Sequence, residues 1–332
     1  MTDKLLEVKD LEVRFRQGAN SVYAVNGVSF DLDQGKTLAI IGESGSGKTV
    51  TSRAMMGLLP NTAVVHGSVK LNGKELVGLS EKEMLQHRGL DLATVFQDPG
   101  RSLNPTMKVG KQIVEAIRLH LPLDKKAARE RAVELLGLVR LPLPAQRFND
   151  YPHQLSGGMR QRVMIAIALA CQPKILIADE ATTALDVTTQ AKIMDLLIDL
   201  QSQFHMALIL ISHNLGLAAQ YTDEVAVMYG GKIVERAGTK ELFSNVLMPY
   251  TRVLLDAVPR LDRSAHDSLP SITGGAPNLT SRPTGCSFMP RCMTATDRCR
   301  EQAPPLAEEE PGHEVACWYP LHDHAALDEV GT

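Results

Sequence analysis

This sequence has few aromatic residues, only short apolar runs and a small net charge. Phenylalanine, tyrosine and tryptophan make up 4% of its 332 residues, and the net charge at pH 7 is −3. The longest uninterrupted apolar stretch covers only residues 163–171, far short of the roughly 18–20 residues that span a bilayer. We therefore expect no membrane-spanning helix, and any role at a membrane would come through partners.

The charge balance and the N-terminal residues argue against two further classes of protein. Lysine and arginine (35) nearly balance aspartate and glutamate (38), so the chain as a whole has no electrostatic attraction to nucleic acid. Residues 1–10 mix acidic and basic side chains with no apolar run behind them, unlike a secretory signal peptide. We expect a cytosolic chain.

Cysteine is also rare, and the positions of the five cysteines are informative. Cys171 stands alone in an apolar helical run, where it is expected to be a small buried hydrophobe. The other four, Cys286, Cys292, Cys299 and Cys317, fall in the last fifth of the chain. In a cytosolic protein such clustering indicates a metal or iron–sulfur centre before it indicates disulfides.

Short apolar runs alternate with helical patterns along the chain. Residues 11–15 and 28–32 alternate like strands, residues 37–41, 175–178 and 207–211 are short apolar runs, and residues 188–204 have a helical pattern. Short apolar strands separated by helices predict an α/β fold with a mostly parallel sheet covered on both faces.

Three other stretches set the expected domain organisation. Residues 108–147 are rich in helix-forming residues and predict an inserted helical subdomain, placed at about residues 100–165. Residues 224–235 predict a hairpin turning on Gly230 and Gly231. After about Arg260 the composition shifts to serine, proline, glycine and threonine. We predict one domain over residues 1–260, then a linker and cysteine-rich region over residues 261–332.

A phosphate-binding loop is predicted at residues 42–49, whose sequence GESGSGKT matches G-x-x-x-x-G-K-[ST] between an apolar strand and a helix. Glycines let backbone N–H groups surround phosphate at a helix N-terminus. Lys48 is expected to reach the β- and γ-phosphates, and Thr49 to bind Mg²⁺. The nucleotide-binding residues predicted here are Gly42, Ser44, Gly45, Ser46, Gly47, Lys48, Thr49 and Val50.

A pair of acids follows the apolar run at residues 175–178. Asp179 is expected to hold Mg²⁺, directly or through water, and Glu180 to polarise the attacking water. Such a pair could also be a solvated strand end, but the upstream phosphate loop favours the catalytic interpretation.

Together with these two motifs, the following features make the sequence resemble the ABC ATPases. LSGGM at residues 155–159 is similar to their signature, Gln97 follows the apolar run at residues 93–96, Ala184, Leu185 and Asp186 follow the acids, and His213 follows the last strand. The ordered set covers roughly residues 5–240. The resemblance implies an ABC-type nucleotide-binding domain with an N-terminal antiparallel β-subdomain and an inserted helical subdomain.

The resemblance also implies a head-to-tail dimer in which ATP lies between one phosphate loop and the partner's signature. Ser156, Gly157 and Gly158 would then meet a γ-phosphate at a helix N-terminus. Gln97 would contact metal and water, His213 would bind the γ-phosphate, and Asp186 would belong to the same nucleotide site. For the aromatic side chain that stacks on adenine we expect Phe15, with Tyr23 as the alternative.

Within that family the sequence is similar to the oligopeptide/dipeptide/nickel importer ATPases, and there to the D-type subunits of dipeptide permeases. The similarity rests on residues 96–99, 102–105, 151–154 and 249–251 and on the cysteine-bearing tail. It implies a second ATPase subunit, two transmembrane permease subunits, an extracytoplasmic solute-binding protein and a place at the cytoplasmic face of the inner membrane. Ala181 departs from the pattern, since the family usually has proline there.

The four tail cysteines are spaced C-x₅-C-x₆-C-x₁₇-C. Structural zinc usually uses a close pair two to four residues apart, so these wider gaps favour a [4Fe–4S] cluster, which the resemblance also implies. Zinc remains the alternative, and disulfides are the less expected outcome in a reducing compartment. Nothing in the sequence links these cysteines to the phosphate chemistry, so we expect a structural or regulatory role.

Two other functions are weighed against import. Some DNA-repair ATPases combine ABC motifs with cysteine-bound metal, but this chain lacks a basic run and a long inserted coiled coil. A P-loop kinase would leave the signature and His213 without a role. An ATPase that energises the import of di-/oligopeptides or a related solute is the preferred hypothesis.

Overall fold

The computed structural model describes residues 4–17, 20–182, 185–257, 275, 277, 279–280 and 284–321. Ala184 and residues 261–274 of the expected linker lie outside these ranges. The chain divides into two compact units, each described here by itself. The first unit comprises residues 1–32, 37–78 and 211–332, and the second comprises residues 33–36 and 79–210.

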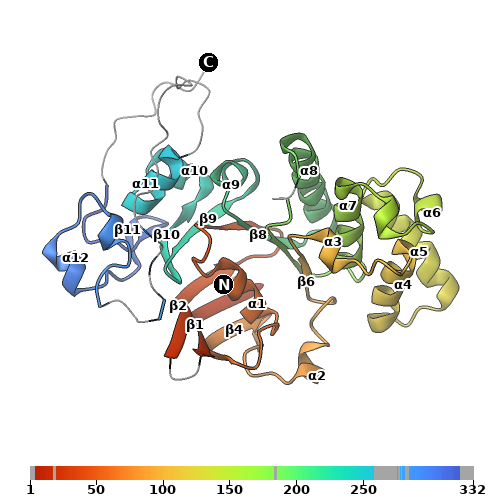
Figure 1. Cartoon of the computed structure of the whole chain (residues 1–332), viewed down its shortest axis with the longest axis horizontal. Helices are drawn as coiled ribbons and strands as arrows, with labels where there is room; N and C mark the ends of the chain where they lie inside the picture. Colours follow the sequence, from red (N-terminus) through yellow and green to blue (C-terminus); the bar gives the residue numbers. More distant parts are fainter. Residues whose placement is uncertain are drawn as a thin grey trace, which may run out of the picture. The chain divides into compact units, whose positions relative to one another are not determined.

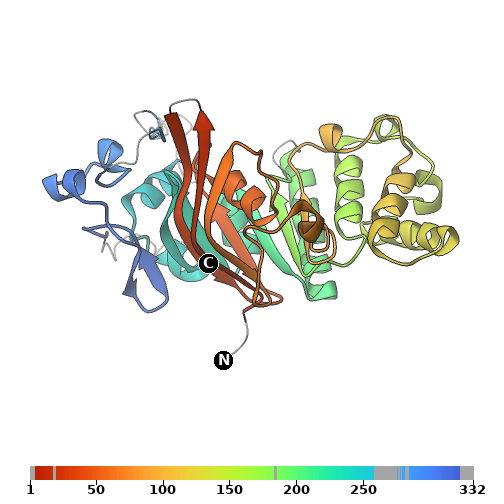
Figure 2. The ribbon, with the colours of Figure 1, turned by 90° about the horizontal axis from the view of Figure 1, so that it is seen from below.

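The first unit begins with an antiparallel sheet in the order β2-β1-β4-β5, as expected for the N-terminal part. Its strands are β1 (Leu6–Gln17), β2 (Asn20–Leu32), β4 (Ala63–Leu71) and β5 (Lys74–Glu75). Figure 2 shows β1 and β2 as two long neighbouring strands, and they pair along almost their whole length. Leu6 and Val8 lie on the buried face of β1, and after a register shift Leu11 and Val13 continue it.

A second sheet in this unit carries the phosphate loop. The buried strand β3 (Thr37–Ile41) precedes helix α1 (Lys48–Met55) and lies parallel to β9 (Glu224–Tyr229). Strand β10 (Lys232–Gly238) returns antiparallel to β9 after the two residues Gly230 and Gly231, whose φ values are 57° and 79°. Two consecutive positive φ values suit glycine, so the predicted hairpin turn is confirmed. Helices α9 (Leu215–Tyr221), α10 (Thr239–Ser244) and α11 (Pro249–Asp256) complete this part.

The cysteine-bearing segment packs in the first unit and extends its second sheet. It forms η2 (Met289–Arg291), α12 (Asp297–Glu301), β11 (Ala307–Glu310) and β12 (His313–Val315), with β12 antiparallel to β10. His313 and Glu235 are both fully buried and lie 3.0 Å apart, Nε2 to Oε1. The same Glu235 oxygen accepts the backbone N–H groups of Leu247 and Met248. One buried carboxylate therefore ties β10, β12 and the start of α11 together.

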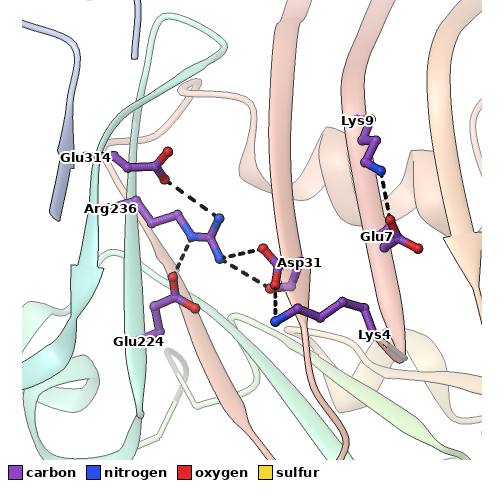
Figure 3. Close-up of polar contacts among 7 residues, drawn as sticks. All are labelled: Lys4, Glu7, Lys9, Asp31, Glu224, Arg236 and Glu314. Atoms are coloured by element: carbon purple, nitrogen blue, oxygen red, sulfur yellow. Dashed lines mark hydrogen bonds and ion pairs between the residues drawn. The ribbon is translucent and has the colours of Figure 1, made fainter. Parts of the chain in front are cut away.

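Arg236 makes a second tie on the neighbouring position of β10. Its guanidinium contacts Glu224 of β9, Asp31 of β2 at 3.1 Å and Glu314 of β12 at 3.8 Å (Figure 3). Lys4 also reaches Asp31, at 2.6 Å. This charge network joins the N-terminal strands to the C-terminal segment within the unit.

The second unit holds most of the helices (Figure 1). Its strands are β6 (Leu92–Val95), β7 (Ile175–Asp179) and the start of β8 (Ala207–Ser212), in the order β8-β7-β6, with β6 and β7 parallel. Its helices are α2 (Glu81–Met84), α3 (Pro99–Ser102), α4 (Val109–His120), α5 (Lys125–Leu138), α6 (Pro144–Arg147), η1 (Pro152–Gln154), α7 (Gly157–Ala168) and α8 (Val187–Phe204).

Amphipathic spacing explains how the inserted helices pack. In α4 the buried residues Val109, Ile113 and Ile117 recur every four positions, which places them on one face. Cys171, expected in the core, is only half-buried, and its Sγ approaches the carbonyl of Ala116 of α4 at 3.8 Å. None of the helices in the described part of the chain is long and apolar enough to cross a bilayer.

Candidate active site

The phosphate loop has the backbone conformation that its glycines predict. Gly45 and Gly47 have φ values of 81° and 106°, a region that side chains disfavour. A Cβ added at Gly47 would lie 2.6 Å from the carbonyl oxygen of Ala24, and one at Gly42 would lie 2.2 Å from that of Met228. Close backbone packing therefore requires glycine at both positions.

Lys48 and Ser46 provide the polar groups of this loop. Lys48 is only 4% exposed, and its ammonium donates to the carbonyls of Gly42 at 2.7 Å and Glu43 at 2.9 Å. Ser46 is equally buried, and within the described residues its hydroxyl has no hydrogen-bond partner. A buried hydroxyl beside a buried ammonium suits an anionic ligand such as phosphate. Ser44 and Gly45 are exposed at the tip of the loop, and Thr49 and Val50 are half-buried in the first turn of α1.

The predicted acid pair, Asp179 and Glu180, lies in the second unit at the end of β7. Asp179 is the last residue of that buried strand and is itself 5% exposed. Glu180 follows with a φ of 49°, an uncommon left-handed conformation for a residue with a side chain. Gln97, just beyond the end of the parallel strand β6, donates its amide to the Glu180 carboxylate at 2.9 Å. The structure thus brings Gln97 and Glu180 together, as their predicted roles around one water require.

The signature residues begin helix α7. Ser156 caps this helix by accepting the backbone N–H of Met159 at 3.4 Å, while Gly157 and Gly158 form its first turn. A Cβ added at Gly158 would lie 3.0 Å from the methyl group of Thr189 in α8, so the two helix starts pack closely. The helix N-terminus presents partly exposed N–H groups, the kind of surface that binds phosphate.

Asp186 has a local role that the sequence did not specify. It caps α8 by accepting the backbone N–H of Thr189 at 2.9 Å. This hydrogen bond holds the pKa of Asp186 below its ordinary value. Asp186 therefore orders the start of α8, close to the signature glycines. Whether it contacts nucleotide stays a prediction.

The remaining predicted residues belong to the first unit. His213 is exposed just after β8, directly before Asn214, which caps α9. Phe15 is half-buried on β1, opposite Val22 and Ala63. Tyr23, the alternative adenine partner, lines a small cavity with Arg14, His66 and their neighbours. The choice between the two aromatic side chains stays a prediction.

The four tail cysteines line one small pocket, called here the cysteine pocket, with side chains that include Met248, Phe288 and Trp318. They are free thiols, and the Cys286 N–H donates to the Cys299 carbonyl at 2.7 Å. Burial raises the pKa of the Cys317 thiol to about 11. Burial also raises the pKa of the Cys286 thiol, and the neighbouring thiols add to both shifts. Such shifts keep these two thiols protonated until a cation stabilises the thiolates.

The sulfur positions bear on the kind of centre that could bind. Among the described residues, no three cysteine sulfurs lie within 4.8 Å of one another. Four thiolates on one zinc ion would lie roughly 3.8 Å apart, given Zn–S bonds of about 2.3 Å in a tetrahedron. In the described part of the chain, the group whose ligand atoms do lie within 4.8 Å of one another is Glu241 of α10 with Glu310 of β11 and His313 of β12.

One contact of the phosphate loop has no signal in the sequence. Arg291, the residue before Cys292, forms two hydrogen bonds with the carboxylate of Glu43, at 2.7 and 2.9 Å. The segment that carries the cysteines therefore contacts the phosphate loop through Arg291, while the structural or regulatory role expected for the cysteines themselves stays a prediction. The two residues are 248 positions apart, and their complementary charges alone gave no signal to pair them.

Comparison with known proteins agrees with this geometry. Residues 25–183 match the family described as ABC transporter, and residues 234–299 match the one described as oligopeptide/dipeptide transporter, C-terminal region. The Bacillus subtilis oligopeptide transport ATP-binding protein OppD is 50% identical over 97% of this chain and 90% of its own length. The dipeptide transport ATP-binding protein DppD of that organism is 48% identical over 99% of this chain and 98% of its own length.

Solved structures are similar as well. The ATP-binding cassette MJ0796, in a dimeric post-hydrolysis state bound to ADP and phosphate, has 28% identity and a TM-score of 0.63. The match covers 70% of this chain and 98% of that one. The cbiO1 protein of Clostridium perfringens, from the cbiONQ transporter complex, has 26% identity and a TM-score of 0.62. That match covers 73% of this chain and 91% of cbiO1.

The fold, the phosphate loop and the paired acids thus define an ABC-type ATPase, which hydrolyses ATP. Within that class, the chain belongs to the family of ATP-binding proteins of oligopeptide and dipeptide ABC transporters.

Proposed function

We propose that this chain is the ATP-hydrolysing subunit of an importer for dipeptides, oligopeptides or a related solute. The observation that carries the proposal is the match of its C-terminal region, together with the near full-length similarity to peptide transport ATP-binding proteins. The chain would lie at the cytoplasmic face of the inner membrane, bound to two permease subunits. A second, related ATPase subunit and an extracytoplasmic solute-binding protein would complete the complex.

Hydrolysis would use residues of this chain and of the partner ATPase. Lys48 and the loop N–H groups would bind the β- and γ-phosphates, and Thr49, Gln97 and Asp179 would hold Mg²⁺. Glu180, oriented by the Gln97 amide at 2.9 Å, would accept a proton from the attacking water. His213 would bind the γ-phosphate. Ser156, Gly157 and Gly158 would close the site of the opposite subunit.

Reconstitution tests the proposal. The transporter purified with its co-purifying subunits is placed in lipid vesicles, and ATP hydrolysis is measured with and without peptide-loaded binding protein. We expect stimulation by peptide and uptake of peptide into the vesicles only with ATP. Salt-sensitive DNA binding and DNA-stimulated hydrolysis, with no effect of peptide, would instead support the repair-type function.

We also propose that the cysteine pocket holds a metal centre, a [4Fe–4S] cluster in the first instance and zinc in the second. Four thiols from one segment converge on this pocket, and their number and type suit either group. The wide gaps between the four cysteines along the sequence favour the larger cluster. When bound, the cluster would link the four cysteines and order the segment. Cys286, Cys292, Cys299 and Cys317 are the proposed ligands.

A further inference from the structure

Three contacts hold Glu43 inside the phosphate loop. Its carbonyl accepts the Lys48 ammonium at 2.9 Å, and its backbone N–H donates to the Tyr250 hydroxyl at 3.0 Å. Its carboxylate receives both terminal nitrogens of Arg291, at 2.7 and 2.9 Å. Two of these contacts come from parts of the chain outside the loop, α11 and the cysteine-bearing segment.

The two outside residues are themselves well fixed. Tyr250 is fully buried, and its ring packs against Tyr229 and Phe288 with centroids 4.5 and 5.3 Å apart. The Arg291 side chain is 5% exposed and also donates to the Tyr229 hydroxyl at 3.3 Å. This buried aromatic group lies in the same core cluster as Cys286, Cys292 and Cys317. Rotating the Arg291 guanidinium away would therefore disturb packed side chains.

The charge of Glu43 needs a partner for electrostatic reasons. A carboxylate within a loop that receives a polyanion would repel it, because like charges only a few ångströms apart are poorly screened by salt. Arg291 neutralises this carboxylate through a bidentate pair, the strong and geometrically specific form of the contact.

We infer that Arg291 is a positioning residue of the nucleotide site, which cancels the charge of Glu43 and fixes the loop backbone that carries Lys48. The cysteine-bearing segment is then part of the ATP site and not only a C-terminal appendage. Because Arg291 directly precedes Cys292, a change at the cysteine pocket would reach the phosphate loop through the Arg291 side chain. The inference rests on the phosphate-binding role proposed for the loop.

The test compares ATP-dependent rates of the assembled transporter carrying Arg291→Ala with the unchanged protein. We expect KM for ATP to rise about tenfold, as for an uncompensated charge near the phosphates, with kcat within about twofold. Arg291→Lys keeps the charge but not the fork, and we expect it to recover most of the loss. Arg298→Ala is the matched control, since this arginine lies on the same segment over the Trp318 ring, 3.6 Å from its centroid. It should leave KM unchanged.

A second variant separates charge from packing. In Arg291→Ala with Glu43→Gln, the repelling charge is gone, so KM should return toward the unchanged value by at least about threefold. If the double variant has a KM for ATP as high as that of Arg291→Ala alone, Arg291 acts only through packing, which contradicts the charge role. An unaltered KM for ATP in Arg291→Ala would overturn the inference outright. Lys48→Ala with normal ATP affinity would instead overturn the phosphate-loop assignment, which separates the two failures.

Discussion

At the scale of single residues, Glu180 is held in an unusual conformation. Its left-handed φ of 49° costs on the order of 1–3 kcal/mol for a residue with a side chain. The Gln97 amide fixes its carboxylate at 2.9 Å. Strain maintained at a carboxylate next to the buried Asp179 fits a residue whose position matters more than local stability.

Replacing Glu180 by Gln should leave ATP binding nearly normal and lower kcat by at least about 100-fold, because the carboxylate acts on water and not on nucleotide. The assembled complex should accumulate with ATP bound. Single-turnover hydrolysis and nucleotide binding are measured on the same preparation. Retention of most of the rate would assign the catalytic carboxylate elsewhere.

Lys48→Ala should, unlike the Glu180 variant, weaken ATP binding itself. The ammonium is buried and donates two hydrogen bonds to loop carbonyls, so it is placed to donate to phosphate instead. Loss of a charged hydrogen bond of about 1.5–3 kcal/mol should weaken ATP binding by roughly 10- to 150-fold. Equilibrium titration with ATP measures this. Lys36→Ala, outside the loop, is the control.

Sequence patterns located these residues, because each belongs to a contiguous motif with a mechanical reason for its spacing. Glu43 and Arg291 could not be paired in the same way, since the contact joins residues distant in sequence through tertiary packing. Tyr250 lay in a family motif at residues 249–251 without a role. Its hydroxyl on the Glu43 N–H now gives it one.

At the scale of elements, local pattern predicted the short buried strands and the glycine hairpin well. Strand β2 was predicted only over residues 28–32, yet it runs from Asn20 to Leu32. The extra length includes Asn26 and Gly27, which disfavour strands, and it is stabilised by pairing with β1 and by Asn26 bonding to Gly231. The addition of β11 and β12 to the sheet of β10 also depends on tertiary contacts, and no periodic pattern in the sequence indicates it.

The buried Glu235–His313 pair makes a prediction about the attachment of β12. Glu235→Ala would leave the imidazole and the N–H groups of Leu247 and Met248 without their buried acceptor. Each buried donor left without an acceptor costs about 1–3 kcal/mol. We expect a lower melting temperature and easier proteolysis in the C-terminal segment. Glu308→Ala, on exposed β11, should change neither.

The cysteine pocket gives the next prediction at this scale. Protein purified without oxygen should be brown, absorb broadly near 400 nm (roughly, as cysteine-ligated iron does) and contain iron and sulfide. Cys292→Ser should remove the colour, whereas Cys171→Ser, outside the pocket, should keep it. Colourless protein with one tightly bound zinc ion would exclude the cluster and retain the metal site.

At the scale of the whole molecule, the proposed function has each phosphate loop complemented by the signature helix of a neighbouring ATPase subunit. The isolated chain should therefore hydrolyse ATP slowly at most. Its rate per molecule should rise with protein concentration if it self-associates, or with added partner ATPase if it does not, since either supplies the N-terminus of α7 in trans. The measurement is hydrolysis against concentration, with mass determined by light scattering. Ser156→Arg, at the cap of that helix, should abolish the rise while leaving ATP binding to the monomer intact. A high rate that is independent of concentration, from a chain shown to be monomeric, would contradict the composite site.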